Sequence, residues 1–280
     1  MPELPEVEII KRGMENALLG KHIKAVQVNR YDLRVRVPQD FRQRVTGKPI
    51  ESLERRGKYI IIRLDANIFI ILHLGMSGRI NIFPPNKPYE PQKHDHVIFT
   101  MDDGTCFAFE DPRRFGTLYI ATNDWRKEKR FADMGPEPLD NEPLDNWMGQ
   151  ALLESLKNKK SAIKTALLDQ RVVAGLGNIY VCEVLFRSSI SPMRTSNSIT
   201  KSEADKIVTH SCIILNEAIK AGGSTLKDYK HTDGSLGYFQ YGFAVYGREG
   251  QECKNKNCAS PILRIVQAGR STFYCPSCQK

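Results

Sequence analysis

The chain has 280 residues, an apolar share of 41% and a net charge of +9 with an isoelectric point near 9.2. This length accommodates two domains, and so basic a chain is typical of proteins that bind a polyanion such as nucleic acid. It has neither a signal peptide nor an apolar run long enough to span a membrane, so we expect a cytoplasmic protein that binds no membrane.

Seven cysteines are an odd number, which argues against a disulfide framework and for a reducing compartment.

The chain begins with Met1-Pro-Glu-Leu-Pro-Glu-Val-Glu8. Because Pro2 is small, we expect Met1 to be removed, which leaves a secondary amine at the N-terminus. Such an amine is partly unprotonated near neutral pH and can attack a sugar or carbonyl carbon to form an iminium intermediate. Glu3 and Glu6 follow on the first turn of a helix predicted for residues 5–19. The segment predicts either a nucleophile with acid/base partners or an ordinary helix start, where proline and acidic residues are common.

Short apolar runs separated by turn residues follow this helix. We predict strands over residues 22–28, 59–64, 68–74, 97–101, 105–109 and 117–120, with hairpin turns at 65–67 and 102–104. Many short strands joined by tight turns indicate an antiparallel β-sandwich or barrel. We therefore expect a first domain, residues 1–135, that combines the leading helix with a sandwich. His94-Asp-His96 suggests a metal site but lacks a third ligand, so we predict that Asp95 holds a neighbouring loop.

A proline-rich stretch predicts a stiff linker at residues 136–150, and the apolar spacing beyond it is helical. We predict helices over residues 146–156, 161–168, 178–186 and 201–220, the last with a capping box of Thr200 and Glu203. This helical domain, residues 151–240, ends in a polar, glycine-rich loop at 224–240 that we expect to act as a lid.

A turn with Gly175 and Gly177 joins two of these helices, and Asn178 begins the second. Backbone N–H groups at a helix N-terminus are suited to hold a phosphate, and several Lys and Arg residues nearby in the sequence strengthen this expectation.

Four cysteines near the C-terminus form two pairs, Cys253 with Cys258 and Cys275 with Cys278, separated by sixteen residues. This spacing predicts one tetrahedral thiolate site for a structural Zn²⁺, since four thiolates leave no open coordination position. Residues 262–267 and 271–274 read as two strands. We therefore expect residues 241–280 to form a zinc-bound β-hairpin, with Arg270 at a tip that can reach a phosphate or a groove.

Three segments resemble one family. MPELPEVE at residues 1–8 is similar to the N-terminus of formamidopyrimidine-DNA glycosylases, which belong to the endonuclease VIII superfamily. VAGLGNIYVCEVLF at 173–186 is similar to their helix–two-turn–helix motif, and AGRSTFYCPSCQ at 268–279 to their zinc hairpin. The resemblance implies an α+β fold and a base-excision repair enzyme that is both a DNA glycosylase and an AP lyase.

By this resemblance the partner is double-stranded DNA with oxidised bases, chiefly 8-oxoguanine opposite cytosine and formamidopyrimidines, bound by a monomer at a bacterial nucleoid. Pro2 would attack C1′ of the damaged nucleotide with help from Glu3 and Glu6. The base then leaves, and β- and δ-elimination cut the strand.

The resemblance also implies roles at the DNA surface. Lys58 contacts a phosphate and supports catalysis together with Arg270. Met76 and Phe115 fill the space left by the everted nucleotide. The remaining implied contacts are Arg113 with the orphaned cytosine, and His73, Asn178 and Arg270 with the DNA backbone.

Two alternatives stay open. One is an endonuclease VIII-type glycosylase for oxidised pyrimidines, against which Leu4 and the set of Met76, Arg113 and Phe115 argue. The other is a non-catalytic zinc-ribbon DNA-binding protein, in which Pro2 would have no purpose. The chain also departs from the family pattern, with a longer spacing between its first two clustered cysteines and with Ser77 where some relatives carry Glu. The second departure leaves the recognition of the oxidised base edge open.

Overall fold

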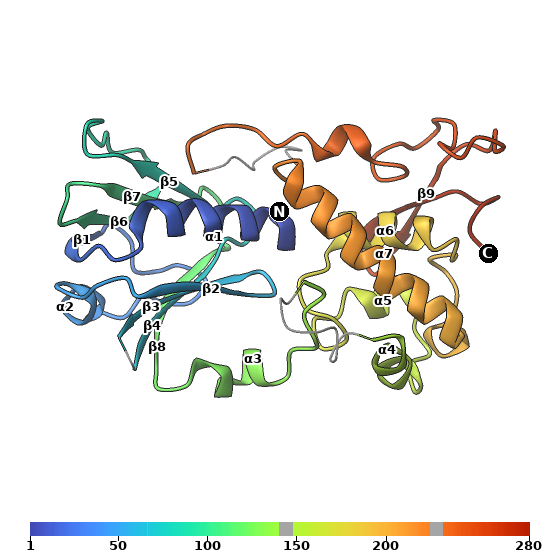
Figure 1. The fold of residues 1–280 in the computed structure, drawn as a ribbon, viewed down its shortest axis with the longest axis horizontal. Coiled ribbons are helices and arrows are strands. Elements are labelled where there is room, and N and C mark those ends of the chain that lie inside the picture. The colour runs from blue at the N-terminus through green and yellow to red at the C-terminus, as the bar shows by residue number, and fades with distance from the viewer. Residues whose placement is uncertain (66, 140–147, 225–231) are drawn as a thin grey trace. The chain divides into compact units, whose positions relative to one another are not determined.

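The computed structural model describes residues 1–65, 67–139, 148–224 and 232–280, which form two compact units. The N-terminal unit consists of residues 1–132 and 221–238, and the C-terminal unit of residues 133–220 and 239–280 (Figure 1). The domain boundaries expected at 135, 150 and 240 stay predictions. Part of the expected linker, 140–147, and part of the expected lid, 225–231, lie outside the described residues.

The N-terminal unit begins with helix α1 (Leu4–Leu18), for which Glu3 is the N-cap residue. The helix buries Val7, Ile10, Met14 and Leu18, which confirms the apolar spacing read from the sequence. Gly20, with φ +78°, follows directly and turns the chain into the first strand.

Two four-stranded antiparallel sheets make up the rest of this unit. One has the order β2-β3-β4-β8 and the other β1-β6-β7-β5 (Figure 1). The bounds are β1 Ile23–Val28, β2 Ser52–Arg56, β3 Tyr59–Asp65, β4 Ile68–His73, β5 Arg79–Phe83, β6 Asp95–Met101, β7 Cys106–Glu110 and β8 Thr117–Thr122. One core cluster joins apolar side chains from both sheets and from α1. The expected sandwich with a leading helix is therefore confirmed.

The six predicted strands are present, and β2 and β5 are additional. Each buries a single side chain, Leu53 in β2 and Ile80 in β5, so neither shows the alternating pattern of a half-buried strand. Two short helices, α2 (Phe41–Val45) and α3 (Lys129–Ala132), are also additional, as is the 3-10 turn η1 (Trp125–Lys127).

Asp95 has the structural role expected for it. Its Oδ2 accepts hydrogen bonds from the Tyr89 hydroxyl at 2.7 Å and from the Gln92 backbone N–H at 3.0 Å, so it holds the loop that precedes β6.

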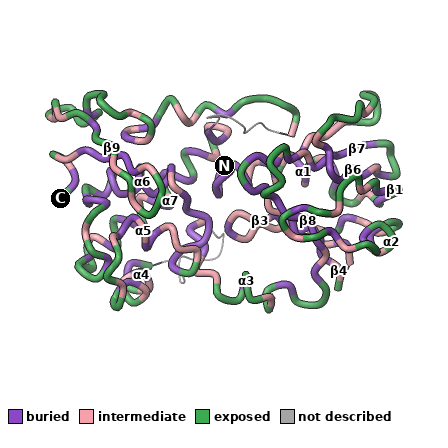
Figure 2. Tube along the Cα trace, turned by 180° about the vertical axis from the view of Figure 1, so that it is seen from behind, coloured by how far each residue is buried: buried purple, intermediate pink, exposed green. Residues whose placement is uncertain are grey.

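The C-terminal unit contains four helices and a two-stranded hairpin among its described residues (Figure 1). The bounds are α4 Gly149–Leu156, α5 Ile163–Leu167, α6 Asn178–Arg187, α7 Lys201–Lys220, β9 Leu263–Gln267 and β10 Arg270–Tyr274, with 3-10 turns η2 (Ser196–Ser198) and η3 (Phe239–Gly242). Helix α6 is buried at every position from 179 to 186, and α7 packs against α4 and α6 (Figure 2). This is why α6 reads as apolar on all sides.

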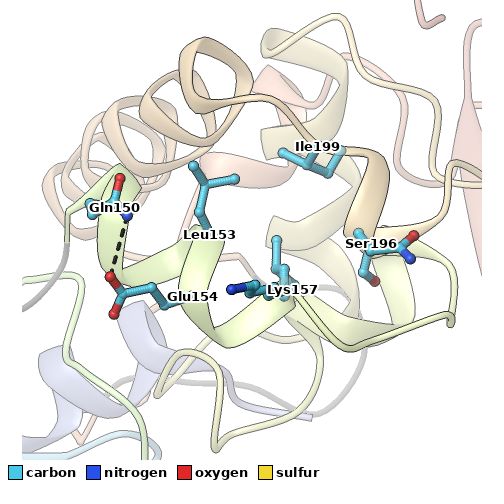
Figure 3. A pocket seen from close by; sticks show the side chains of 8 residues that line it. Gln150, Leu153, Glu154, Lys157, Ser196 and Ile199 are labelled. Carbon is cyan, nitrogen blue, oxygen red and sulfur yellow. Dashed lines mark hydrogen bonds between the residues drawn. The ribbon is translucent and has the colours of Figure 1, made fainter.

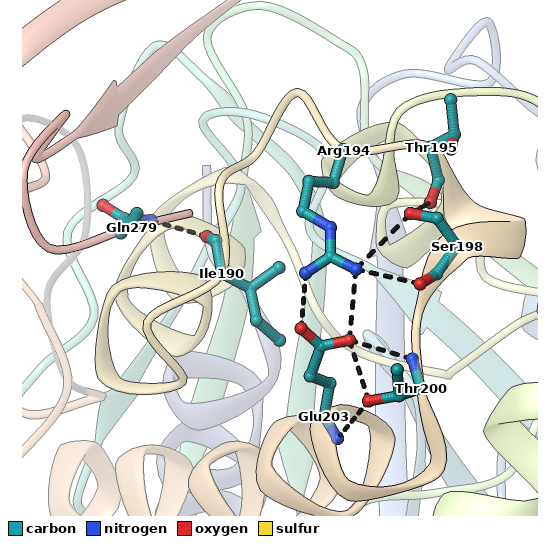
Figure 4. Close-up of polar contacts among 7 residues, drawn as sticks. All are labelled: Ile190, Arg194, Thr195, Ser198, Thr200, Glu203 and Gln279. Atoms are coloured by element: carbon teal, nitrogen blue, oxygen red, sulfur yellow. Dashed lines mark hydrogen bonds and ion pairs between the residues drawn. The ribbon is translucent and has the colours of Figure 1, made fainter.

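The predicted capping box at the start of α7 is present (Figure 4). The backbone N–H of Thr200 donates to Glu203 Oε2 at 2.9 Å, and the backbone N–H of Glu203 donates to Thr200 Oγ1 at 3.3 Å. The guanidinium of Arg194 pairs with the same carboxylate, which ties the preceding loop to the helix start.

A buried carboxylate connects α6 to the segment that leads to the cysteine cluster. Glu183 accepts hydrogen bonds from the backbone N–H groups of Ala244, Val245 and Tyr246 at 2.8, 3.0 and 2.8 Å. Three successive amides around one carboxylate fix this connection firmly, because charged acceptors form strong hydrogen bonds.

Candidate active site and nucleic-acid interface

The start of the chain is built into the N-terminal unit. Pro2 is buried, while the preceding Met1 is 47% exposed. Glu3 and Glu6 are also buried, at 2% and 1% exposure, and the backbone N–H of Glu3 donates to Glu6 Oε2 at 2.9 Å. The positive end of the α1 dipole favours carboxylates in this position. The structure therefore brings three of the five predicted catalytic residues, Pro2, Glu3 and Glu6, together at one helix start.

The carboxylate of Glu6 also binds a segment far along the chain. Its Oε1 accepts hydrogen bonds from the backbone N–H and the hydroxyl of Ser224, both at 2.9 Å. Gly223 precedes this serine with φ +74°, and a Cβ there would lie 3.2 Å from Glu6 Oε1. The sequence does not predict this partner, because Glu6 and Ser224 are 218 positions apart.

Lys58 lies in a turn directly before the strand that pairs with the end of β4, where His73 is. Gly57 and Lys58 form the two-residue turn between β2 and β3, and Tyr59, the first residue of β3, pairs with His73 at the end of β4. The rings of Tyr59 and His73 are 4.6 Å apart. The Gly75 backbone N–H donates to His73 Nδ1 at 3.0 Å, which leaves the ring proton on Nε2.

Burial first, and the nearby positive charges of Lys58, Arg34 and Arg130 in addition, lower the pKa of His73 to about 4. His73 is therefore a neutral hydrogen-bond donor at physiological pH. It borders a cavity of about 690 Å³ whose charged lining residues are Arg34, Glu128, Lys129 and Arg130. The basic excess suits an anion such as a phosphate. Arg34, Lys129 and Arg130 are not among the predicted site residues, although they belong to basic runs at 34–36 and 126–130.

Met76, Arg113 and Phe115 lie on two loops that touch. The Met76 and Phe115 side chains are 38% and 41% exposed, and the Arg113 guanidinium stands 5.0 Å from the centre of the Phe115 ring. Gly75 has φ +63°, and a Cβ there would lie 2.4 Å from the backbone carbon of Phe115. Exposed apolar side chains next to an arginine suit insertion into a DNA groove or base stack.

In the C-terminal unit, a hydrogen bond from Asn178 to Ser271 places Asn178 near Arg270, the neighbour of Ser271 in sequence. Asn178 begins α6, and its Nδ2 donates to the backbone oxygen of Ser271 at 2.9 Å. Arg270, the residue before Ser271, is exposed. The two turn residues of the hairpin are Ala268 and Gly269, both with positive φ, so Arg270 is the first residue of β10 and lies beside the tip.

The exposed positive charge around the turn with Gly175 and Gly177 is smaller than the number of Lys and Arg residues in the sequence indicates. Lys164 is fully buried, so it adds nothing to the surface. Asp169 pairs with Arg171 at 2.9 Å and with Lys159 at 3.5 Å, and the hydrogen bonds from Arg171 lower the pKa of Asp169 to about 2. The start of α6 and the exposed Arg270 remain the candidate phosphate-binding groups of this unit.

The four cysteines converge as predicted. All four Sγ atoms lie within 4.8 Å of one another, with 3.8 Å between Cys253 and Cys278 and 3.6 Å between Cys258 and Cys275. Sulfurs about 2.3 Å from a tetrahedral zinc ion lie about 3.8 Å apart, so the cluster fits one structural Zn²⁺. The longer spacing between its first two members does not prevent this geometry.

A second pocket, of about 390 Å³, lies beside α4 and η2 (Figure 3). Its walls include Gln150, Leu153, Lys157, Ser196 and Ile199. None of the predicted site residues lines it. No helix in the described part of the chain is long and apolar enough to cross a membrane.

Three family models match the chain. They are the formamidopyrimidine-DNA glycosylase N-terminal domain over residues 1–118, the formamidopyrimidine-DNA glycosylase H2TH domain over 134–230, and a zinc finger found in FPG and IleRS over 250–280. Together with the sandwich, the buried proline and the four-cysteine hairpin, they define a DNA glycosylase of the helix–two-turn–helix class. More particularly, the chain belongs to the formamidopyrimidine-DNA glycosylase family.

Similar proteins extend over the full length. The formamidopyrimidine-DNA glycosylases of Roseobacter denitrificans and Caulobacter vibrioides are each 47% identical, with 100% of both chains covered. The crystal structure of the MutM (FPG) protein from Thermus thermophilus has a TM-score of 0.86 at 36% identity, covering 99% of this chain and 98% of that one. The Lactococcus lactis Fpg in complex with DNA containing an abasic site has a TM-score of 0.87 at 33% identity, with 100% of both chains covered.

Proposed function

We propose that this protein removes oxidised purines from duplex DNA and then cleaves the strand at the resulting abasic site. The observation that carries the proposal is the buried start of the chain, where Pro2, Glu3 and Glu6 meet in a chain of the formamidopyrimidine-DNA glycosylase family. A structural neighbour from Lactococcus lactis was solved with Fapy-dG-containing DNA, which supports a ring-opened purine as a substrate.

In the proposed reaction Met1 is removed first, so that Pro2 presents a secondary amine. This amine attacks C1′ of the damaged nucleotide, the base leaves, and an iminium joins the protein to the sugar. Glu3 is the group proposed to move protons at the sugar. Glu6, whose oxygens accept bonds from Glu3 and Ser224, orients the helix start. The iminium acidifies the C2′ protons, so β-elimination and then δ-elimination release the strand ends.

We further propose that the exposed side chains of the N-terminal unit enter the duplex. Met76 and Phe115 would occupy the space of the everted nucleotide, and Arg113 would bond the orphaned cytosine. Replacing lost stacking by apolar side chains offsets a few kcal/mol of unstacking. Lys58 and the neutral Nε2–H of His73 would contact phosphates, which the basic cavity beside His73 supports.

In the C-terminal unit, Asn178 and Arg270 are the proposed contacts with the DNA backbone, and Arg270 also supports catalysis by holding the phosphate close to the lesion. The hydrogen bond from Asn178 to Ser271 supports a shared role for the pair. The four cysteines would hold a structural Zn²⁺ that stabilises the hairpin carrying Arg270, and four thiolate ligands would leave no open position for chemistry. We propose that the protein acts as a monomer, and a duplex DNA partner would place it at the bacterial nucleoid.

The decisive experiment is borohydride trapping with a duplex that contains 8-oxoguanine opposite cytosine. Wild-type protein should form a covalent adduct and nick the strand, and peptide mapping should place the adduct at Pro2. The Pro2→Gly variant should do neither at a comparable rate. The matched control is Pro5→Gly, which alters a proline of the same segment and leaves the terminal amine intact. Equal trapping by Pro2→Gly and wild type would remove Pro2 from the mechanism.

The alternatives give different results in the same assay. An endonuclease VIII-type enzyme would nick a thymine-glycol duplex faster than the 8-oxoguanine duplex. A non-catalytic DNA-binding protein would bind intact and damaged duplexes equally and cut neither. The full-length similarity to formamidopyrimidine-DNA glycosylases favours the purine enzyme.

A further inference from the structure

Two buried polar side chains connect the loops that carry Met76, Arg113 and Phe115. Ser77 and Asp111 are 4% and 0% exposed, and the hydroxyl of Ser77 donates to Asp111 Oδ1 at 2.6 Å. The second carboxylate oxygen, Oδ2, accepts the backbone N–H of Gly116 at 2.7 Å. Since charged acceptors in a dry environment form strong hydrogen bonds, these contacts hold their loops in one arrangement.

The hydroxyl of Ser77 also accepts a hydrogen bond. Ser77 Oγ accepts the backbone N–H of Arg113 at 3.2 Å while it donates to Asp111. One hydroxyl therefore sets the position of the Arg113 backbone relative to the loop of Met76. The backbone oxygen of Asp111 in turn accepts a hydrogen bond from His96 Nε2 at 2.7 Å, which fixes the loop to strand β6.

Glycines bring the two loops into direct backbone contact. A Cβ at Gly75 would meet the backbone of Phe115, and a Cβ at Gly116 would lie 3.0 Å from Asp111 Oδ2 and 2.9 Å from the His73 backbone oxygen. The loops therefore fit together without space between them, and one cannot shift without the other.

We propose that Ser77 and Asp111 are positioning residues that preassemble Met76, Arg113 and Phe115 into a single surface before DNA binds. The inference rests on the proposed function, in which these three side chains enter the duplex. We call Ser77 and Asp111 the clamp. Met76 is next to Ser77 in the sequence, Arg113 is two positions from Asp111, and Phe115 precedes Gly116, whose backbone N–H donates to Asp111. A surface ordered in advance does not lose loop entropy on binding, so the binding free energy remains available for base eversion.

The test uses Asp111→Asn and Ser77→Ala. Asparagine keeps the size of the side chain but offers a single acceptor oxygen for two donors, and alanine leaves the N–H of Arg113 without its partner. Thr105→Val is the matched control: it removes a buried hydroxyl that donates to Asp103 Oδ2 at 3.0 Å, in the β6–β7 turn of the same unit. All three variants should lose similar thermal stability.

Two substrates separate positioning from folding. One is the duplex with 8-oxoguanine opposite cytosine, and the other is a single-stranded oligonucleotide with an abasic site, which has no stacked base to evert and no partner base. In single-turnover assays we expect Asp111→Asn and Ser77→Ala to cut the duplex about 100-fold more slowly, the size expected for a misplacement of about 1 Å. They should cut the single strand within about twofold of wild type.

A third readout follows the contact with the opposite base. Wild type should prefer 8-oxoguanine opposite cytosine over adenine, and both clamp variants should lose that preference if Arg113 is displaced, while Thr105→Val keeps it.

The proposal is overturned if the clamp variants match Thr105→Val on both substrates, or if their two rates fall together with the melting temperature. Should Asp111→Asn not fold, Ser77→Ala, which removes only a hydroxyl, gives the answer. Failure of the proposed function has a different signature, since wild-type protein itself would then not cut the 8-oxoguanine duplex efficiently.

Discussion

Single residues explain how distant parts of the N-terminal unit are held at the start of α1. Glu6 accepts hydrogen bonds from a residue 218 positions away, and the contact requires a glycine at 223, where the backbone has φ +74°. The sequence identifies Glu6 as a site residue through its family motif. It cannot identify Ser224 as the partner, because a pair so far apart leaves no periodic signal in one sequence.

Replacing Gly223 by alanine should destabilise the protein by two additive effects. The positive φ costs an L-residue about 1 kcal/mol, and the new Cβ, 3.2 Å from Glu6 Oε1, should add about 1 kcal/mol of crowding. Gly20→Ala is the control, since Gly20 has φ +78° but no atom within 4 Å of the added Cβ. Urea unfolding should give the larger loss for Gly223→Ala, and equal losses would show that Glu6 does not limit this position.

His73 predicts a pH dependence of stability. Its pKa is lowered by burial and by Lys58, Arg34 and Arg130 to about 4, below the usual 6.5. The unfolded chain therefore binds more protons between pH 6.5 and 4, and the contribution of His73 is complete above pH 6.5 and is lost as the pH falls through this window. At pH 5 this titration lowers the free energy of unfolding by about 2 kcal/mol.

The measurement is the free energy of unfolding of wild type and His73→Gln at pH 7.5 and pH 5. Glutamine does not titrate, so the variant should lose about 2 kcal/mol less than wild type between the two pH values. Identical pH dependence of both proteins would contradict a neutral His73.

At the scale of helices and strands, the sequence predicts the elements whose apolar periodicity or turn residues are characteristic. Helix α1, with Val7, Ile10, Met14 and Leu18 on its buried face, and the zinc hairpin follow directly from spacing. Strand β2 was missed because its sequence, Ser-Leu-Glu-Arg-Arg, buries one side chain, so the neighbouring strand and not its own pattern determines its structure. The clamp of Ser77 and Asp111 was also missed, because it depends on a tertiary contact between residues 34 positions apart.

Removing zinc should unfold the hairpin first. Chelation should expose the four clustered thiols to a thiol reagent and abolish hydrogen-exchange protection in β9 and β10, because so small an element has too little core to fold alone. Strands of the N-terminal unit should keep their protection. Cys278→Ser should bind metal poorly, whereas Cys106→Ser, which alters a cysteine outside the cluster, should bind one equivalent. Full protection of the hairpin in metal-free protein would refute a structural role for zinc.

For the whole molecule, the net charge of +9 indicates a polyanion as partner, but only part of that charge is available to it. Lys164 is buried, and Arg171 pairs with Asp169. Composition alone therefore overestimates the positive surface, while the motif residues Lys58 and Arg270 remain as the proposed phosphate contacts.

Salt titration of DNA binding should separate these cations. Each phosphate contact contributes about 0.9 to the slope of log K against log salt concentration, so Lys58→Ala and Arg270→Ala should each reduce the slope by about 1. Arg126→Ala changes the net charge equally but removes a cation that pairs with Glu54 at 2.9 Å. Fluorescence anisotropy should therefore show an unchanged slope for this variant. A similar reduction in all three variants would mean that net charge, and not these contacts, sets the slope.

The three amides that surround Glu183 have a consequence for how the protein recovers after it loses its metal ion. These hydrogen bonds do not involve sulfur, so they still attach residues 244–246 to α6 after the hairpin has lost its ion and unfolded. In a molecule without zinc, the four thiols therefore stay in one short segment whose start is anchored, at a high local concentration. Such a molecule can recover by capturing a new ion and does not have to be degraded and synthesised again.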